Sequence, residues 1–365
     1  MSEIIVDSVK ISEVKPHHNA DKLDIVKCYG FEVVTQRGKY KVGDRVIYLP
    51  PDSVITPELE AILFPPDSKI FLNNRRIRAI KIRGQISYGM IVDSSKVNID
   101  YVIANVSKYE PPAASIPAHM GVKTSKKISN PNFTKYTDIE NFKYYDRVFQ
   151  DGEPVYVSEK LHGTSFRCGW FKNEPTTLWK KALNFLGLLQ PYEFCWGSRT
   201  VQIQGKVLGH KGYYDEDVYT KMVNQYNLKS VIPKGFGVYG EIVGDGIQKN
   251  YTYGCKQGEH KLYVYDISIE TPDHPFAKNR WLNFEEFDNM IVQMGLTPVP
   301  NLYVGPFDAS VINLLRDGDS TVGGQPVREG VVIKSLVEEF AACGRKALKY
   351  ISDAYYLQKD GTDFH

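Results

Sequence analysis

The stretch Val155-Tyr156-Val157-Ser158-Glu159-Lys160-Leu161-His162-Gly163-Thr164 decides how the rest of the chain is interpreted. Residues 155–159 have the alternation of a β-strand, and this strand would deliver Lys160 to its end. Gly163 follows closely, and its missing side chain would let the backbone approach a ligand. The stretch therefore predicts an accessible lysine beside a close-approach loop.

Five further fragments follow this lysine in order. They are Gly197-Ser198-Arg199, Tyr239-Gly240-Glu241-Ile242-Val243-Gly244, Tyr263-Val264-Tyr265-Asp266-Ile267, Arg328-Glu329-Gly330-Val331-Val332-Ile333-Lys334 and Lys346-Ala347-Leu348-Lys349. Each fragment is weak evidence alone, since a strand preceded by a turn would explain it. The ordered set is what covalent nucleotidyl transfer through a lysine requires.

The chemistry gives each residue type a reason. A lysine that attacks an α-phosphorus must lose its proton, and nearby cations lower the pKa of an amine. Arg199, Lys334 and Lys349 are candidates for those cations. A divalent cation on the phosphates needs carboxylates, and Glu241 and Glu329 each sit beside a glycine at a strand edge.

Bulk properties set the frame for this reading. The chain has 365 residues, 42% hydrophobic and 24% charged, which is typical of a globular protein with two domains. No apolar run is long enough to span a membrane, and the N-terminus lacks a signal-peptide pattern. Five dispersed cysteines favour reduced thiols and argue against structural zinc. We expect an intracellular protein, cytoplasmic or nuclear, without membrane association.

The net charge of +2 does not by itself indicate a polyanion partner, but the basic residues are clustered along the chain. Residues 68–92 contain six bases and no acid, and residues 111–137 contain four lysines and no acid. Such runs could follow a phosphate backbone, although a charge run is more often a solvated face.

The domain pattern changes twice along the chain. Residues 1–105 read as short strands with regular turns, typical of a small β-barrel, and a parity slip between Ala79 and Ile80 predicts a β-bulge. Residues 106–135 resemble a proline-containing linker. Residues 136–365 indicate an α+β domain with antiparallel sheets and flanking helices, including a helix starting at Thr137 and an amphipathic helix over 176–189.

The motif series over residues ~135 to 350 resembles that of the covalent nucleotidyltransferase superfamily, which includes ATP-dependent DNA ligases, RNA ligases and mRNA capping enzymes. It is most similar to RNA ligases, where the lysine motif commonly reads Lys-x-His-Gly, as it does at Lys160. The stretch 239–248 and the segment Lys135–Asn141 are also similar to the RNA ligase form.

Residues Pro16–Ile25 resemble the opening of tRNA-binding OB modules, which agrees with the barrel expected from strand spacing. An OB-type barrel before a nucleotidyltransferase (adenylation) domain resembles one RNA ligase subclass, which joins a 3′-hydroxyl to a 5′-phosphate, often at nicks. Candidate nucleic-acid contacts on the barrel are Arg76, Arg78, Lys81, Arg83 and Tyr88. The alternative is that this barrel packs on the catalytic domain.

The resemblance implies ATP and Mg²⁺ or Mn²⁺ as cofactors and a set of site residues. Lys160 would carry the AMP, and Glu241 and Glu329 would organise the metal. Tyr265 would stack on adenine, Arg199 would contact ribose or phosphate, and Lys334 and Lys349 would neutralise the phosphates. Glu159, His162 and Gly163 complete the expected nucleotide-binding set.

Two departures from the family pattern concern the expected nucleotide-binding set. His162 replaces the aspartate of some relatives, so the metal would rest on the two glutamates. RNA ligases often carry Lys-x-Lys in the last motif, but Ile351 stands two positions after Lys349. Lys346 could substitute for the missing lysine.

Other functions remain open from the sequence. A capping enzyme would need an OB module after the last motif, and the chain stops at His365. An NAD-dependent DNA ligase is disfavoured by the missing zinc cysteines. A non-catalytic RNA-binding protein on a decayed ligase fold is the alternative from another class. The expected partner is RNA, as a nicked duplex or an RNA/DNA hybrid, and no protein partner is implied.

Overall fold

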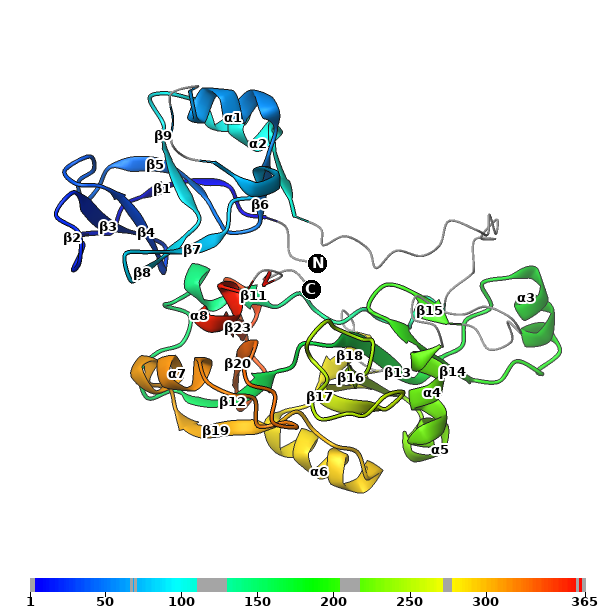
Figure 1. Ribbon diagram of the computed structural model, residues 1–365. Helices are drawn as coiled ribbons and strands as arrows, with labels where there is room; N and C mark the ends of the chain where they lie inside the picture. The colour runs from blue at the N-terminus through cyan, green and yellow to red at the C-terminus, as the bar shows by residue number, and fades with distance from the viewer. Residues whose placement is uncertain are drawn as a thin grey trace.

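The computed structural model describes residues 4–65, 68, 71–109, 130–203, 217–271, 278–358 and 361–362. They form two units that lie one above the other, with the C-terminal end of the chain between them (Figure 1). In these ranges, no helix is long and apolar enough to cross a membrane.

The N-terminal unit is the expected β-barrel. Its elements are β1 (Asp7–Lys10), β2 (Glu13–Pro16), β3 (Leu23–Cys28), β4 (Phe31–Gln36), β5 (Arg45–Leu49), β6 (Ser53–Ile55), α1 (Pro57–Leu63), the 3-10 turn η1 (Asn73–Arg75), β7 (Ala79–Ile82), β8 (Gln85–Tyr88), β9 (Met90–Asp93), α2 (Ile99–Ala104) and β10 (Val106–Lys108). The strands pair in the orders β1-β5-β9, β2-β3-β4, β7-β8 and β10-β6. Because β10 pairs with β6, this unit continues past residue 105.

The C-terminal unit contains two antiparallel sheets with flanking helices. Its elements are β11 (Glu140–Asn141), η2 (Phe142–Tyr144), β12 (Pro154–Lys160), β13 (Thr164–Lys172), α3 (Leu178–Phe185), β14 (Tyr192–Ser198), β15 (Gln202–Ile203), α4 (Val218–Gln225), α5 (Leu228–Val231), β16 (Phe236–Gly244), β17 (His260–Glu270), β18 (Asn279–Trp281), α6 (Phe284–Met294), β19 (Asn301–Pro306), α7 (Ala309–Arg316), β20 (Gly330–Ser335), β21 (Phe340–Ala341), β22 (Gly344–Arg345), β23 (Ala347–Ile351) and α8 (Asp353–Tyr356). The expected α+β class is confirmed.

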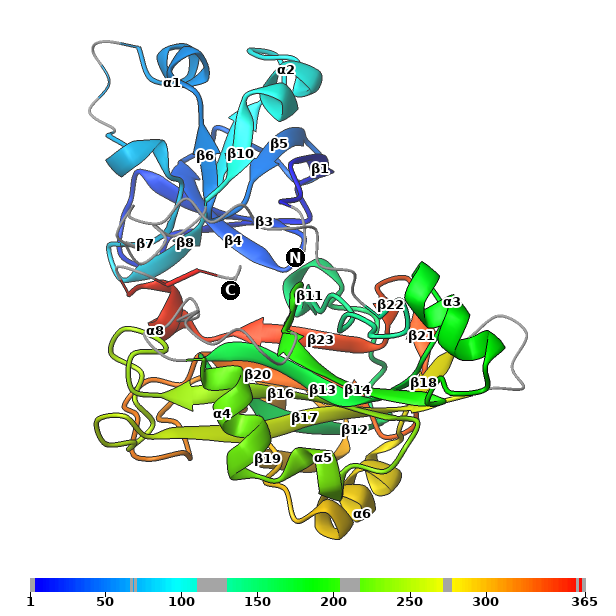
Figure 2. The ribbon, with the colours of Figure 1, turned by 90° about the vertical axis from the view of Figure 1, so that its right-hand side faces the viewer.

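The two sheets face one another in the lower unit (Figure 2). One has the order β11-β23-β20-β12-β19, in which β11 and β23 run parallel, and the other has the order β15-β14-β13-β16-β17-β18. Helices α4 and α6 pack on β17, and α7 packs on β20. This leaves the ends of β12, β13, β16 and β20 free to meet in a cleft.

Two local predictions were wrong. No helix begins at Thr137, because residues 134–139 are irregular and Glu140–Asn141 instead pair with β23. No bulge lies between Ala79 and Ile80, because β7 pairs with β8 in regular register and Ile80 is simply exposed. Most of the expected linker, residues 110–129, falls outside the described residues.

The predicted helix over 176–189 is confirmed, in the shorter form of α3. Thr177 caps its N-terminus by accepting a hydrogen bond from the backbone N of Lys180. Apolar side chains of this helix lie on the surface: Leu178 and Phe185 are 87% and 89% exposed.

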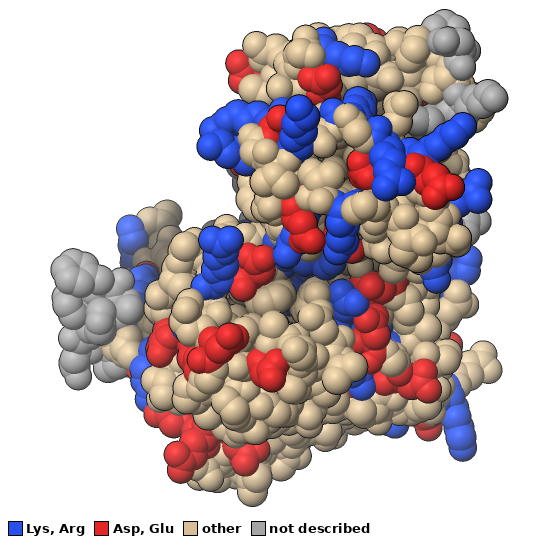
Figure 3. All heavy atoms as spheres, turned by 90° about the vertical axis from the view of Figure 1, so that its left-hand side faces the viewer, with Lys and Arg blue, Asp and Glu red and all other residues tan. Residues whose placement is uncertain are grey.

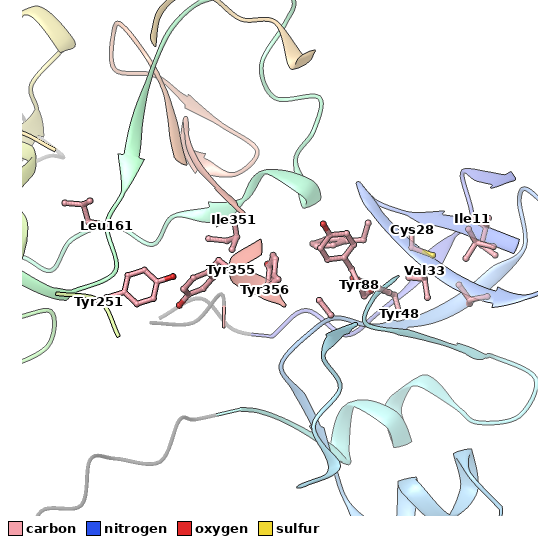
Figure 4. Packing of buried hydrophobic residues seen from close by; sticks show 14 of the residues in the cluster. Ile11, Cys28, Val33, Tyr48, Tyr88, Leu161, Tyr251, Ile351, Tyr355 and Tyr356 are labelled. Carbon is pink, nitrogen blue, oxygen red and sulfur yellow. Dashed lines mark hydrogen bonds between the residues drawn. The ribbon is translucent and has the colours of Figure 1, made fainter. Parts of the chain in front are cut away.

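The two units share one hydrophobic core. Ile11, Val33 and Tyr48 of the barrel and Leu161, Tyr251 and Ile351 of the C-terminal unit belong to the same cluster of buried residues (Figure 4). The backbone also connects them, since Gly30 N donates to Lys143 O at 2.6 Å. A continuous core of this kind fixes the barrel on the second unit.

Candidate active site

A cleft of about 350 Å³ lies between the two sheets of the C-terminal unit. All ten residues expected to bind nucleotide line it: Glu159, Lys160, His162, Gly163, Arg199, Glu241, Tyr265, Glu329, Lys334 and Lys349. One sheet supplies Lys160, Lys334 and Lys349, and the other supplies Glu241 and Tyr265. Residues that are far apart in sequence thus converge on one cavity.

Lys160 lies at the mouth of this cleft because of strand register. It ends β12 and pairs with Gly330 of β20, so the residue before Gly330 stands beside it. Lys160 Nζ lies 2.6 Å from Glu329 Oε1, and the Glu329 side chain is only 1% exposed. The strand register thus places Lys160 in an ion pair with a buried carboxylate.

Gly163 allows Glu241 to approach the lysine loop. A Cβ atom at position 163 would lie 2.2 Å from Ile242 O and 2.8 Å from Glu241 Cγ. Burial raises the pKa of Glu241 to about 8; the Glu329 carboxylate acts in the same direction, whereas Lys160 opposes it. A cation between the two carboxylates would relieve this electrostatic cost.

Tyr265 and Arg199 occupy the side of the cleft formed by the larger sheet. Tyr265 Oη lies 3.3 Å from Ser165 Oγ, and its ring packs edge-on against Tyr136. Arg199 forms an ion pair with Asp138, which also lines the cleft. Both side chains are placed where a bound nucleotide could meet them.

Lys334 has a different environment from the one expected. Its ammonium donates to Asp266 Oδ2 at 2.8 Å and to Tyr265 O at 2.9 Å, and the residue is 2% exposed. Arg345 contacts the same carboxylate, and these cations overcome burial to lower the pKa of Asp266 to about 2. The Lys334 ammonium therefore forms a buried ion pair with Asp266, in addition to lining the cleft.

The two lysines of the last motif, Lys346 and Lys349, have different surroundings. Lys349 pairs with Val332 across β23 and β20 and lines the cleft. Lys346 instead forms ion pairs with Glu153 and Glu339 and is absent from the described lining residues. Ile351 is fully buried in the shared core. The geometry thus offers no support for Lys346 as a substitute lysine.

Glu159 is held by a neighbouring loop. Its carboxylate accepts hydrogen bonds from Ser320 Oγ and from Thr321 N and Oγ1, and its backbone N donates to Pro300 O. These contacts fix the residue that precedes the lysine.

The barrel residues expected to contact nucleic acid divide into two groups. Arg76 is buried and bonded to Asp52 and to Gly361 O, Arg78 donates to Gln358 O, and Tyr88 is buried against α8. These three serve the contact between the units, because their partners lie there. Lys81 and Arg83 are exposed.

Several cleft residues were not predicted. Gln248 donates to Gly163 O at 2.7 Å, Asp138 pairs with Arg199, and Lys108 reaches the cleft from the barrel. Gln248 and Asp138 lie in fragments similar to the RNA ligase form, which was an available signal. Lys108 had no such signal. Among the described residues, no group of three or more His, Cys, Asp or Glu side chains could hold a metal.

Comparison with known families agrees with this geometry. A family model described as RNA ligase matches residues 153–351, and an OB-fold domain model matches residues 5–94. The chain belongs to the RNA ligase family. A search of curated proteins finds no match.

Solved structures show the same fold over nearly the whole chain. Naegleria gruberi RNA ligase with PPi has 20% identity and a TM-score of 0.69, covering 97% of this chain and 98% of the other. A mutant of that ligase with ATP and Mn has 20% identity and a TM-score of 0.69, covering 96% and 97%. A mutant with AMP and Mn matches with the same identity and TM-score, covering 96% and 97%.

Proposed function

We infer that this RNA ligase joins 3′-hydroxyl and 5′-phosphate ends through a lysyl-AMP on Lys160 and an adenylylated polynucleotide. The observation that carries this proposal is the position of Lys160, 2.6 Å from buried Glu329 in a cleft that also holds Glu241, Tyr265 and Lys349. The structural relatives crystallised with ATP, AMP and PPi support a nucleotide in this cleft.

In the first step, Lys160 Nζ forms a bond to the α-phosphorus of ATP, pyrophosphate leaves, and the amine loses its proton. The Lys160 ammonium must first give a proton to water or to the Glu329 carboxylate 2.6 Å away, because the attacking nitrogen needs a free lone pair. AMP then passes to a 5′-phosphate, and attack by a 3′-hydroxyl forms the phosphodiester and releases AMP. All three steps depend on positioning and charge neutralisation.

The remaining cleft residues have proposed roles in this scheme. Tyr265 stacks on adenine, and Glu159 contacts the adenine amino group through its backbone or flank. Arg199 contacts ribose or phosphate after leaving Asp138, and Lys349 neutralises the α-phosphate. Lys334, which is paired with Asp266 and lines the cleft, neutralises charge on the phosphates.

Glu241 and Glu329 would hold Mg²⁺ or Mn²⁺. Burial and the neighbouring Glu329 carboxylate raise the pKa of Glu241. Two carboxylates facing a cleft for phosphates fit a hard divalent cation whose other ligands would be water and phosphate oxygen. Such a cation would supply charge stabilisation at the phosphate. Glu241→Ala and Glu329→Ala are expected to impair adenylylation at every metal concentration.

The proposed substrate is RNA at a nick, in duplex RNA or an RNA/DNA hybrid. Lys and Arg side chains gather on the N-terminal unit and along the crevice between the units in Figure 3, and exposed Lys81 and Arg83 belong to the N-terminal unit. We propose residues 1–105, together with β10 (Val106–Lys108), as the nucleic-acid-binding module. The rest of residues 106–135 would be the linker, and residues 136–365 the nucleotidyltransferase domain.

The test is to incubate the protein with ATP labelled at the α-phosphate and a divalent metal, without RNA. Label should appear on the protein and be lost in Lys160→Ala. No label, or label that survives this substitution, would contradict the lysine mechanism and favour an RNA-binding protein without catalysis. Nicked duplexes with RNA or DNA on each side would then separate the substrates.

A further inference from the structure

Helix α8 stands between the barrel and the cleft, and contacts both. Its N-cap residue Ser352 donates its backbone N–H to Glu329 O at 2.9 Å, so the start of the helix is hydrogen-bonded to the residue that pairs with Lys160. Its other side faces the barrel, where Tyr356 packs edge-on against Tyr88 at 5.7 Å between ring centroids. In Figure 4, Tyr251, Tyr355, Tyr356 and Tyr88 follow one another across this junction.

Tyr355 of this helix reaches His162, two residues after the lysine. Its hydroxyl lies 3.4 Å from His162 Nδ1, a long hydrogen bond, and its ring packs edge-on against the imidazole. Tyr251 packs on the same imidazole, and Tyr253 Oη accepts from His162 N at 2.7 Å. The imidazole is thereby held with Nδ1 3.8 Å from Glu329 Oε2.

The Tyr355 hydroxyl is itself oriented from the C-terminal tail, residues 361–362. The backbone N–H of Thr362 donates to the Tyr355 oxygen, so the phenol hydrogen is available to His162 Nδ1 in the tautomer that carries its proton on Nε2. Burial raises the pKa of Tyr355 well above its usual range, so the phenol keeps this hydrogen. Gly361 in turn accepts a hydrogen bond at 2.8 Å from Arg76 of the barrel.

We propose that Tyr355 is a positioning residue for lysine adenylylation: its hydroxyl, held by the tail that Arg76 anchors, orients His162 beside Glu329 and Lys160. The barrel then contributes to the first chemical step through contacts that involve no nucleic acid. This inference rests on the proposed function of Lys160.

The test compares two substitutions that each remove one hydroxyl from the same helix. Tyr355→Phe should lower the maximal single-turnover rate of Lys160 adenylylation by about tenfold, as loss of an orienting partner does, with the half-saturating ATP concentration unchanged. Tyr356→Phe, which loses the hydroxyl bonded to Asn141, should retain the wild-type rate. Equal rates for Tyr355→Phe and wild type would overturn the proposal.

A double variant separates positioning from general weakening of the fold. If Tyr355 acts through His162, Tyr355→Phe combined with His162→Ala should be no slower than His162→Ala alone, and fully additive losses would contradict the proposal. Thr362→Pro, which removes the backbone donor, should reproduce the Tyr355→Phe defect, whereas Thr362→Ala should not. Thermal unfolding of each variant verifies that it folds.

A spectroscopic measurement tests the contact between Tyr355 and His162 even if the protein takes no label from ATP. In ¹⁵N-histidine NMR, the Nδ1 resonance of His162, assigned with His162→Ala, should shift in Tyr355→Phe and stay in Tyr356→Phe. An unshifted resonance would refute the positioning role. Absence of label on wild-type protein would refute the ligase mechanism instead.

Discussion

At the scale of residues, Lys160 ends β12 and Lys334 lies one residue before the end of β20, yet their ammonium groups meet different carboxylates. Lys160 pairs with Glu329 at the cleft, and Lys334 pairs with Asp266 beneath it. The motif predicted that both residues line the same cavity. It could not predict the direction of Lys334, because Asp266 and Arg345 come from strands that only the folded sheets bring together.

Substitution of Lys334 should therefore weaken the fold. Lys334→Met leaves Asp266 with Arg345 and the Tyr136 hydroxyl. We expect the free energy of unfolding to fall by about 1–3 kcal/mol, the cost of a lost buried hydrogen-bonded charge. Urea unfolding measures the change. Lys346→Met, which breaks the more exposed pairs with Glu153 and Glu339, is the matched control and should cost less than about 1 kcal/mol. Equal losses would show that Asp266 does not depend on Lys334.

Gly163 provides a second residue-scale prediction. In Gly163→Ala, the new methyl group would overlap Ile242 O, so either the lysine loop or β16 with Glu241 must move. We expect label transfer to Lys160 to fall by about a hundredfold, as a displacement near 1 Å can cause. Gly187→Ala, at an exposed helix end with open space around it, should leave labelling unchanged. A fully active Gly163→Ala would show that the loop tolerates the shift.

At the scale of elements, the sequence predicted strands that follow from local alternation and glycine placement. It missed elements whose structure depends on partners distant in sequence. Strands at Val155, Phe236, Lys261 and Gly330 follow from local pattern, and each is present. The segment at Thr137 carries a helix-start signal, but β23 recruits Glu140 and Asn141 into a sheet. The parity slip at Ala79 and Ile80 reflects an apolar residue left on the surface.

Helix α3 has an exposed apolar face, and we expect polar substitutions there to leave stability unchanged. Phe185 and Leu178 bury little surface, so Phe185→Ser and Leu178→Ser should change the free energy of unfolding by less than about 0.5 kcal/mol. Thr177→Ala, which removes the N-cap, should cost about 1 kcal/mol. Chemical denaturation measures all three. A large loss in Phe185→Ser would mean that this face is covered in solution.

At the scale of the molecule, the barrel and the catalytic unit are joined as parts of one core. Arg76 and Arg78 were interpreted from a run of bases, and their burial in this junction could not be foreseen, because charge pattern does not reveal which bases find partners inside. Lys143 lies in the same junction with its ammonium 3.7 Å from the centre of the Tyr88 ring.

Lys143 should make stability depend on pH. Burial lowers the pKa of Lys143 from 10.5 to about 8, so the folded protein releases this proton before the unfolded chain does. Stability should therefore rise between pH 8 and pH 10.5, by an amount up to about 3 kcal/mol. Urea unfolding at pH 7.5 to 9.5 measures the slope relative to Lys143→Met, which should lack this contribution. Identical slopes would show that Lys143 stays charged in the folded state.

The position of β12 between β20 and β19 also has a consequence for synthesis. Its partners β19 and β20 begin at Asn301 and Gly330, so the lysine strand leaves the ribosome long before either neighbour exists. At a translation rate of about 5–20 residues per second, this strand remains for many seconds without the two strands that hydrogen-bond to it. The nascent chain must be kept from aggregating during that interval, and the reactive lysine acquires its glutamate partner only when translation is nearly finished.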